Sequence, residues 1–162
     1  MEKETLEIPY KLISNLRIAV VFTSFFAISV IMIVIVNLSV AIFSLQENLS
    51  LVISSVINLF ISLLAIFSLT IFYKINDYIE KKEIDKISSS YYIIINGIIL
   101  LIYNLFALLS SIVLFLINLT VEIIIAIIIY GLFGIFAGIF QILAYSQLNS
   151  YITYYKTAHE KI

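Results

Sequence analysis

The sequence predicts an all-α integral membrane protein whose four transmembrane helices form two antiparallel hairpins in a bundle, with both termini cytoplasmic. Three observations predict this: the composition, four long apolar runs, and the distribution of the basic residues. Of 162 residues, 63% are hydrophobic and only 12% are charged, and the mean hydropathy is +1.17. A soluble domain of this size would have too little polar surface to face water. We therefore expect a multi-pass protein of the cell membrane, or of the membrane of a virus.

The apolar runs are long enough to cross a bilayer as helices, which takes about 20 residues. They cover residues 18–45, 49–73, 91–119 and 121–148. The runs are continuously apolar and do not alternate as barrel strands would. In lipid the backbone must satisfy its own hydrogen bonds, so even runs of isoleucine are expected to be helical.

These runs divide the chain into a transmembrane domain and its flanking segments. We expect residues 1–17 to form a cytoplasmic or interfacial N-terminal segment, and residues 18–148 to form the transmembrane domain. Within that domain residues 74–90 form a cytoplasmic loop, and residues 149–162 form a cytoplasmic tail. The opening "MEKETLEIPY" mixes both charge signs and no A-x-A-like site closes the first run, so we expect this run to be retained as a span.

The basic residues predict the orientation. All nine lie before the first span, between the second and third, or after the fourth, and none lies in the other two connections. They are Lys3, Lys11, Arg17, Lys74, Lys81, Lys82, Lys86, Lys156 and Lys161. Because Lys and Arg collect on the cytoplasmic side, both termini are expected inside.

The two outer connections are short, at residues 46–50 and 118–122, so the helices that they join are expected to be antiparallel neighbours. Each connection contains an N-x-[ST] pattern, at Asn48 and at Asn118. Two interpretations stay open for these residues: glycosylation, or a plain role in a turn.

The inner loop, residues 74–90, is the largest polar segment. Its mixed charges at helical spacing predict that the second helix continues beyond the membrane. Four Lys are balanced by two Asp and two Glu, which argues against a nucleic-acid partner.

Small residues share one face of the fourth span. This chain has four glycines, and three of them lie in "GLFGIFAGIFQ". At 100° per residue, a helix-packing face forms from small residues and one glutamine, while most Leu, Ile and Phe side chains point to the other side. The face consists of Gly131, Gly134, Ala137, Gly138 and Gln141. Its neighbour is either another span of the chain or a partner protein.

Polar residues share faces in the first three spans as well. We expect a buried polar stripe that consists of Asn37, Ser54, Asn58, Ser62, Asn96, Asn104 and Ser111. The same projection places Thr23 and Gly97 on these faces. Such residues hold membrane bundles together through close approach and interhelical hydrogen bonds. A path for a neutral solute is the alternative that stays open for these residues.

The middle of each span contains no Asp, Glu, Lys, Arg or His, and the chain has no Cys. A membrane carboxylate for proton-coupled transport, paired haem-ligating histidines and a catalytic dyad are therefore all missing. We expect no enzyme activity, no cofactor and no metal site. His159, the only histidine, lies in the inner tail.

The function predicted is that of a non-catalytic structural or packing subunit of a larger membrane assembly, such as a homo-oligomer, a respiratory or secretion complex, or a viral envelope. Its partners would be membrane lipids and a membrane protein or a second copy. Two alternatives stay open: a small channel or facilitator for a neutral solute, and a lipid- or quinone-binding accessory subunit. The bias toward Ile, Tyr and Asn is typical of a thermophilic archaeal or AT-rich source.

Overall fold

The protein is all-helical over the residues that the computed structural model describes, which are 9–43, 49–87, 91–115 and 121–159. Helix α1 covers Tyr10–Phe43, α2 Leu49–Glu80, α3 Tyr91–Phe115 and α4 Val121–His159, with a short 3-10 helix, η1, at Ile84–Lys86. All four α-helices are long and apolar enough to cross a membrane. The prediction of an all-α chain with four helices of membrane-spanning length is confirmed, and these helices suit a multi-pass membrane protein.

Three helices are much longer than a bilayer requires. The 34 residues of α1, the 32 of α2 and the 39 of α4 give lengths of about 51, 48 and 58 Å, against a hydrocarbon core of about 30 Å. Helix α1 begins directly after Pro9, so residues 10–17 continue the helix that enters the apolar run. Helix α4 likewise continues through most of the C-terminal segment.

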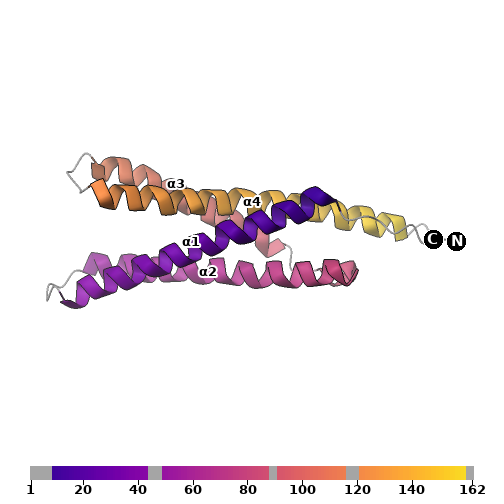
Figure 1. The fold of residues 1–162 in the computed structure, drawn as a ribbon, viewed down its shortest axis with the longest axis horizontal. Helices are drawn as coiled ribbons and strands as arrows, with labels where there is room; N and C mark the ends of the chain where they lie inside the picture. Colours follow the sequence, from indigo (N-terminus) through magenta and orange to yellow (C-terminus); the bar gives the residue numbers. More distant parts are fainter. Residues whose placement is uncertain (1–8, 44–48, 88–90, 116–120, 160–162) are drawn as a thin grey trace.

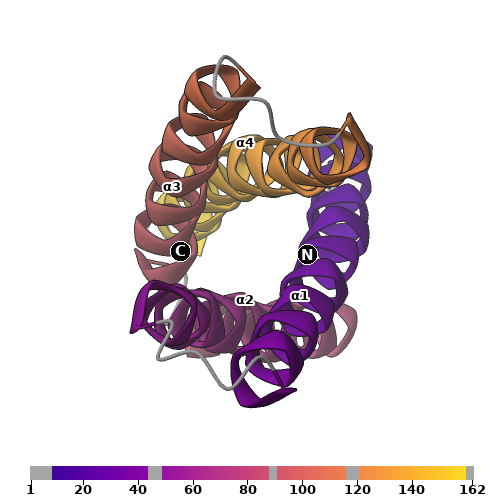
Figure 2. The same ribbon diagram turned by 90° about the vertical axis from the view of Figure 1, so that its left-hand side faces the viewer.

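Consecutive helices run in opposite directions (Figure 1). Helix α1 packs against α2 and α4, and α3 packs along α4, whereas α2 and α3 contact each other only sparsely. As a consequence, α2 and α3 are far apart at the end where α2 begins, as the end view in Figure 2 shows. The α1/α2 pair and the α3/α4 pair therefore converge at one end of the molecule, called here the inner end, and diverge at the outer end.

An apolar core holds the inner end together. Its side chains recur at intervals of three and four residues, so each helix turns one stripe inward. The members are Leu12, Leu16, Ala19, Ile71, Phe72, Ile75, Ile79, Ile84, Ile87, Ile93, Ala144, Leu148 and Tyr151. Because η1 and the start of α1 contribute to it, this core extends past the apolar runs.

A second, smaller core lies halfway along the bundle. It consists of Phe26, Ala27, Val30, Ile61, Ala65, Leu100 and Ala137. Phe26 and Phe72 are completely or almost completely buried, although the helical projection placed phenylalanine mainly toward lipid. Small neighbours such as Ala27, Ala65 and Ala137 leave the space that the Phe26 ring fills.

Helix α2 ends in a hydrogen-bonded cap. The N–H of Glu83 donates to the Tyr78 carbonyl (2.8 Å), and the N–H of Lys82 donates to the Ile79 carbonyl (3.1 Å). This pair of bonds is a Schellman motif, which needs a left-handed residue, and Lys82 supplies it with φ 58°. The ion pair of Lys81 with Asp77 (2.8 Å) lies on the last turn, where its hydrogen bond raises the pKa of the Lys81 ammonium.

Candidate functional site

The centre of the bundle contains a polar layer to which every α-helix contributes one side chain. The central polar layer consists of Thr23 of α1, Ser68 of α2, Asn96 of α3 and Gln141 of α4, all buried. Gln141 Nε2 donates to Thr23 Oγ1 (2.9 Å), and Asn96 Nδ2 donates to Gln141 Oε1 (3.0 Å). Asn96 Nδ2 also donates to Ser68 Oγ. These bonds tie α1 to α4, α4 to α3, and α3 to α2.

The central polar layer joins the two helix pairs at the level where they converge. Interhelical hydrogen bonds in membrane proteins contribute about 0.6 kcal/mol on average and up to about 1.7 kcal/mol. Three such bonds are therefore worth about 2 kcal/mol, enough to fix the register of four helices but not to replace apolar packing. Amides and hydroxyls stay neutral at physiological pH, so the chemistry that this layer offers is hydrogen bonding.

The four glycines form a close-contact seam between α3 and α4, called here the glycine seam. A Cβ added at Gly138 would lie 2.7 Å from the Gly97 carbonyl oxygen and 2.9 Å from the Leu101 nitrogen. A Cβ added at Gly97 would lie 3.0 Å from the Gly138 carbonyl oxygen. The two backbones thus meet at Gly97 and Gly138, where side chains would hold the helices apart.

The rest of the glycine seam receives side chains of α3. A Cβ at Gly134 would overlap the side-chain amide of Asn104, and one at Gly131 would lie 2.9 Å from Leu108 Cδ2. Asn104 is fully buried there, and its Nδ2 donates to the Leu100 carbonyl (2.7 Å). The three glycines of the helix-packing face thus lie against a neighbouring helix of the same chain.

The other two members of that face, Ala137 and Gln141, do not contact α3 alone. Ala137 is buried in the core with Phe26 and Leu100. Gln141 lies one turn beyond Ala137 and contacts α1 and α3 through the central polar layer. The single face that the projection predicted therefore serves α3 with its glycines and α1 with its glutamine.

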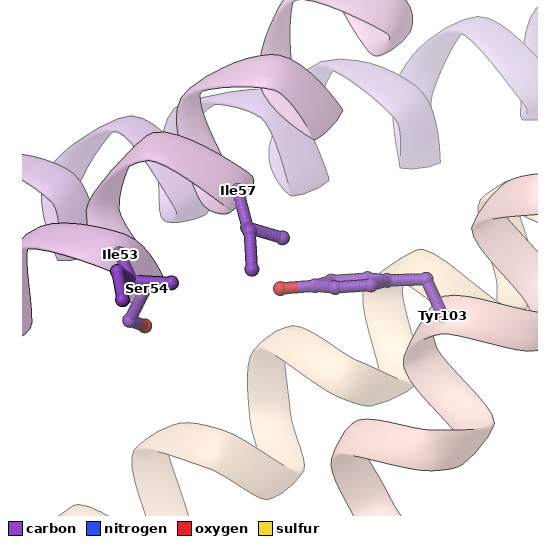
Figure 3. A pocket seen from close by; sticks show the side chains of 4 residues that line it. All are labelled: Ile53, Ser54, Ile57 and Tyr103. Atoms are coloured by element: carbon purple, nitrogen blue, oxygen red, sulfur yellow. The ribbon is translucent and has the colours of Figure 1, made fainter. Parts of the chain in front are cut away.

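A second polar cluster lies between α2 and α3, toward the outer end. The Tyr103 hydroxyl donates to Asn58 Oδ1 (2.6 Å), and Asn58 Nδ2 donates to the carbonyl and the hydroxyl of Ser54 (2.9 and 3.3 Å). Ile53, Ser54, Ile57 and Tyr103 line an open cavity of about 400 Å³ here, and Figure 3 shows the Tyr103 ring reaching across it toward α2. This is the side on which α2 and α3 diverge.

The remaining residues of the predicted polar stripe lie in varied places. Ser62 is buried and its hydroxyl donates to the Leu59 carbonyl (2.7 Å), whereas Asn37 is half-buried. The side chain of Ser111 lies outside the described part of the chain, as do Asn48 and Asn118, so the glycosylation patterns stay predictions.

Two contributors to these clusters were not among the predicted site residues. Ser68 lies three residues after Ala65 on the polar face of α2, so the same projection could have found it. Tyr103 lies seven residues after Asn96, on the same face of α3, so the projection could have found it as well. Which side chains they meet depends on how the helices are registered, and no single-helix pattern contains that information.

Within the described ranges, no three His, Asp or Glu side chains gather as a metal site would require. Comparisons with protein-family models, with curated proteins and with solved structures found no match to this chain.

Proposed function

We propose that this chain is a non-catalytic membrane protein that acts as a packing subunit of a larger membrane assembly. We further propose that it is inserted as two antiparallel hairpins with both termini in the cytoplasm. The observation that carries the proposal is the central polar layer, in which Thr23, Ser68, Asn96 and Gln141 bond to one another across the four helices. Their hydrogen-bonding capacity is used largely to join helices.

Apolar residues close the bundle on both sides of this layer. Phe26 and Leu100 lie toward the outer end, and Phe72 and Ile93 lie toward the inner end, each at most 2% exposed. A route for a polar solute would need polar groups or open space at these levels. The arrangement therefore supports a packed scaffold better than a pore.

The divergence of α2 and α3 supports a role within an assembly. On this side α2 presents Ile53 and Ile57, which line the open cavity and are 50 and 48% exposed. Where α1 and α4 meet, near the centre of the bundle, direct contact closes the space between them, and Phe22 stacks on Phe140 at 5.7 Å. We propose that a transmembrane helix of a partner, or of a second copy, packs on the open α2/α3 side.

The positions of the described basic residues support the proposed orientation. Lys11, Arg17, Lys74 and Lys156 belong to the inner-end segments of α1, α2 and α4, and Lys81, Lys82 and Lys86 follow the end of α2. This end would face the cytoplasm, because positive charge is retained on that side.

Cysteine labelling tests the orientation, because the chain contains no Cys and single-cysteine variants need no background substitutions. We expect Lys81→Cys to be protected from a membrane-impermeant maleimide in intact cells, and Glu47→Cys to be labelled. Labelling of Lys81→Cys in intact cells would overturn the proposed orientation. Native mass spectrometry after extraction in mild detergent tests the assembly, since a chain that is always monomeric would contradict a packing role.

A second candidate function, conduction of water or a small neutral solute, is favoured by one observation. Among the described side chains, three buried amide oxygens accept no hydrogen bond, namely Asn96 Oδ1, Asn104 Oδ1 and Gln147 Oε1. They lie at successive levels of the α3/α4 pair and could receive hydrogen bonds from a solute. Proteoliposome flux that Asn104→Leu abolishes would favour this function, and impermeable vesicles would dismiss it.

A further inference from the structure

A second cavity, of about 370 Å³, lies between α1 and α2 near the inner end and is called here the α1/α2 pocket. Its apolar lining comes from Leu16, Val20 and Val21 of α1 and from Phe72 of α2. Leu16 and Phe72 are nearly fully buried members of the inner core, so they form a fixed floor. Val21 is half exposed, so this part of the pocket opens toward the surroundings of the bundle.

The polar lining of the α1/α2 pocket comes from Arg17, Tyr73 and Asn76. Arg17 is exposed, and no acidic side chain of the described ranges forms an ion pair with it. The two carboxylates that follow the pocket along α2 are both engaged, because Asp77 pairs with Lys81 (2.8 Å) and Glu80 accepts a hydrogen bond from Asn76 Nδ2 (2.7 Å). The Arg17 guanidinium is therefore available for an anion.

The pocket changes from apolar to polar at the level where the membrane is expected to end. The first apolar run begins at residue 18, directly after Arg17, and the second ends at residue 73. Val20 and Val21 thus lie on the membrane side of this boundary, and Asn76 lies on the aqueous side. A phospholipid has the same order of polarity, with its chains inward and its phosphate at the interface.

We propose that the α1/α2 pocket binds one anionic phospholipid of the cytoplasmic leaflet. The Arg17 guanidinium forms paired hydrogen bonds with the phosphate, a geometry for which arginine is better suited than lysine. An acyl chain lies along Val20 and Val21. A zwitterionic lipid carries an ammonium that offsets its phosphate, so the pocket discriminates by net charge. This proposal rests on the proposed membrane insertion with the inner end in the cytoplasm.

Lipid retention tests the proposal. The full chain is purified from membranes in mild detergent, exchanged into equal amounts of phosphatidylglycerol and phosphatidylcholine with identical chains, and analysed by native mass spectrometry. We expect one phosphatidylglycerol per chain to be retained in preference to phosphatidylcholine, and Arg17→Gln to reduce this preference about 5-fold, the effect of one interfacial cation. Excess inorganic phosphate should not displace the lipid, because the acyl chain contributes to binding.

Two matched variants distinguish lipid binding in the pocket from a general attraction of anionic lipid to surface charge. Lys74→Gln removes an exposed cation next to Tyr73 that does not line the pocket, and it should leave the preference unchanged. Val21→Trp fills the apolar part and keeps the charge, and it should reduce retention of phosphatidylglycerol.

Several outcomes would overturn the inference. These are equal retention of the two lipids, an unchanged preference in Arg17→Gln, an equal loss in Lys74→Gln, displacement by inorganic phosphate, or full retention in Val21→Trp. If any of these outcomes is seen while the protein is still recovered from membranes as a helical assembly, only the proposal of a lipid site is contradicted. Failure to recover it from membranes would overturn the proposed function itself.

Discussion

At the scale of single residues, the glycine seam and the central polar layer join the helices in two different ways. Gly97 and Gly138 allow the α3 and α4 backbones to approach each other, since a Cβ on either would meet backbone atoms. Gln141, one turn from Gly138, then reaches Asn96 on α3 and Thr23 on α1. Close approach therefore places the amides within bonding distance, and substitutions at these positions should differ in a graded way.

Gly138→Ala should destabilise the protein more than Gly131→Ala. The added methyl of Gly138→Ala meets the backbone of Gly97 and Leu101, which cannot yield without separating α3 from α4, and such overpacking costs about 1–3 kcal/mol. The methyl of Gly131→Ala meets the end of the Leu108 side chain, which can rotate away. Unfolding in detergent by a sodium dodecyl sulfate titration, followed by circular dichroism, measures both variants, and equal losses would refute the backbone contact.

Gln141→Leu should lower the free energy of unfolding by about 1–2 kcal/mol, because two interhelical hydrogen bonds are lost and Thr23 loses a donor. Ser39→Ala is the control, since the Ser39 hydroxyl only donates to the Ile35 carbonyl of its own helix (2.8 Å). The same titration gives both values. A Gln141→Leu variant as stable as Ser39→Ala would show that the layer does not join the helices.

At the scale of elements, single-helix periodicity accounts for which face of each helix is buried, but not for what that face contacts. The spacing of Gly131, Gly134 and Gly138 predicted one contact surface, yet α3 as their neighbour follows from helix packing. Thr23 and Gln141 are 118 residues apart, and their bond depends on the register between α1 and α4. Phe26 is buried because Ala65 of α2 and Ala137 of α4 leave room for its ring, a complementarity that no one helix contains.

The end of α2 carries a residue poorly suited to its conformation. Lys82 occupies the left-handed region with φ 58°, which costs a non-glycine residue about 1–2 kcal/mol. Lys82→Gly should therefore stabilise the protein by about 1 kcal/mol, whereas Lys74→Gly, inside α2, should destabilise it by about that amount. Destabilisation by Lys82→Gly in thermal unfolding would argue against the Schellman cap.

At the scale of the whole molecule, the bundle is packed at the inner end, and at the outer end the α1/α2 pair and the α3/α4 pair separate. Composition and run length were enough to predict four membrane-length helices, because lipid leaves the backbone few alternatives. The asymmetry between the two ends could not be predicted in this way. It arises from the extensive contacts of α1 with α2 and of α3 with α4, together with a sparse contact between α2 and α3.

The central claim is that the open α2/α3 side receives a helix of a partner or of a second copy. Site-specific photocrosslinking in intact cells tests it most directly, with the crosslinker at Ile57, beside the open cavity, or at Phe25, which stacks on Phe133 where α1 and α4 are in contact. We expect a defined protein adduct at Ile57 and none at Phe25. Lipid adducts alone at Ile57, or the same protein adduct at both positions, would contradict the claim.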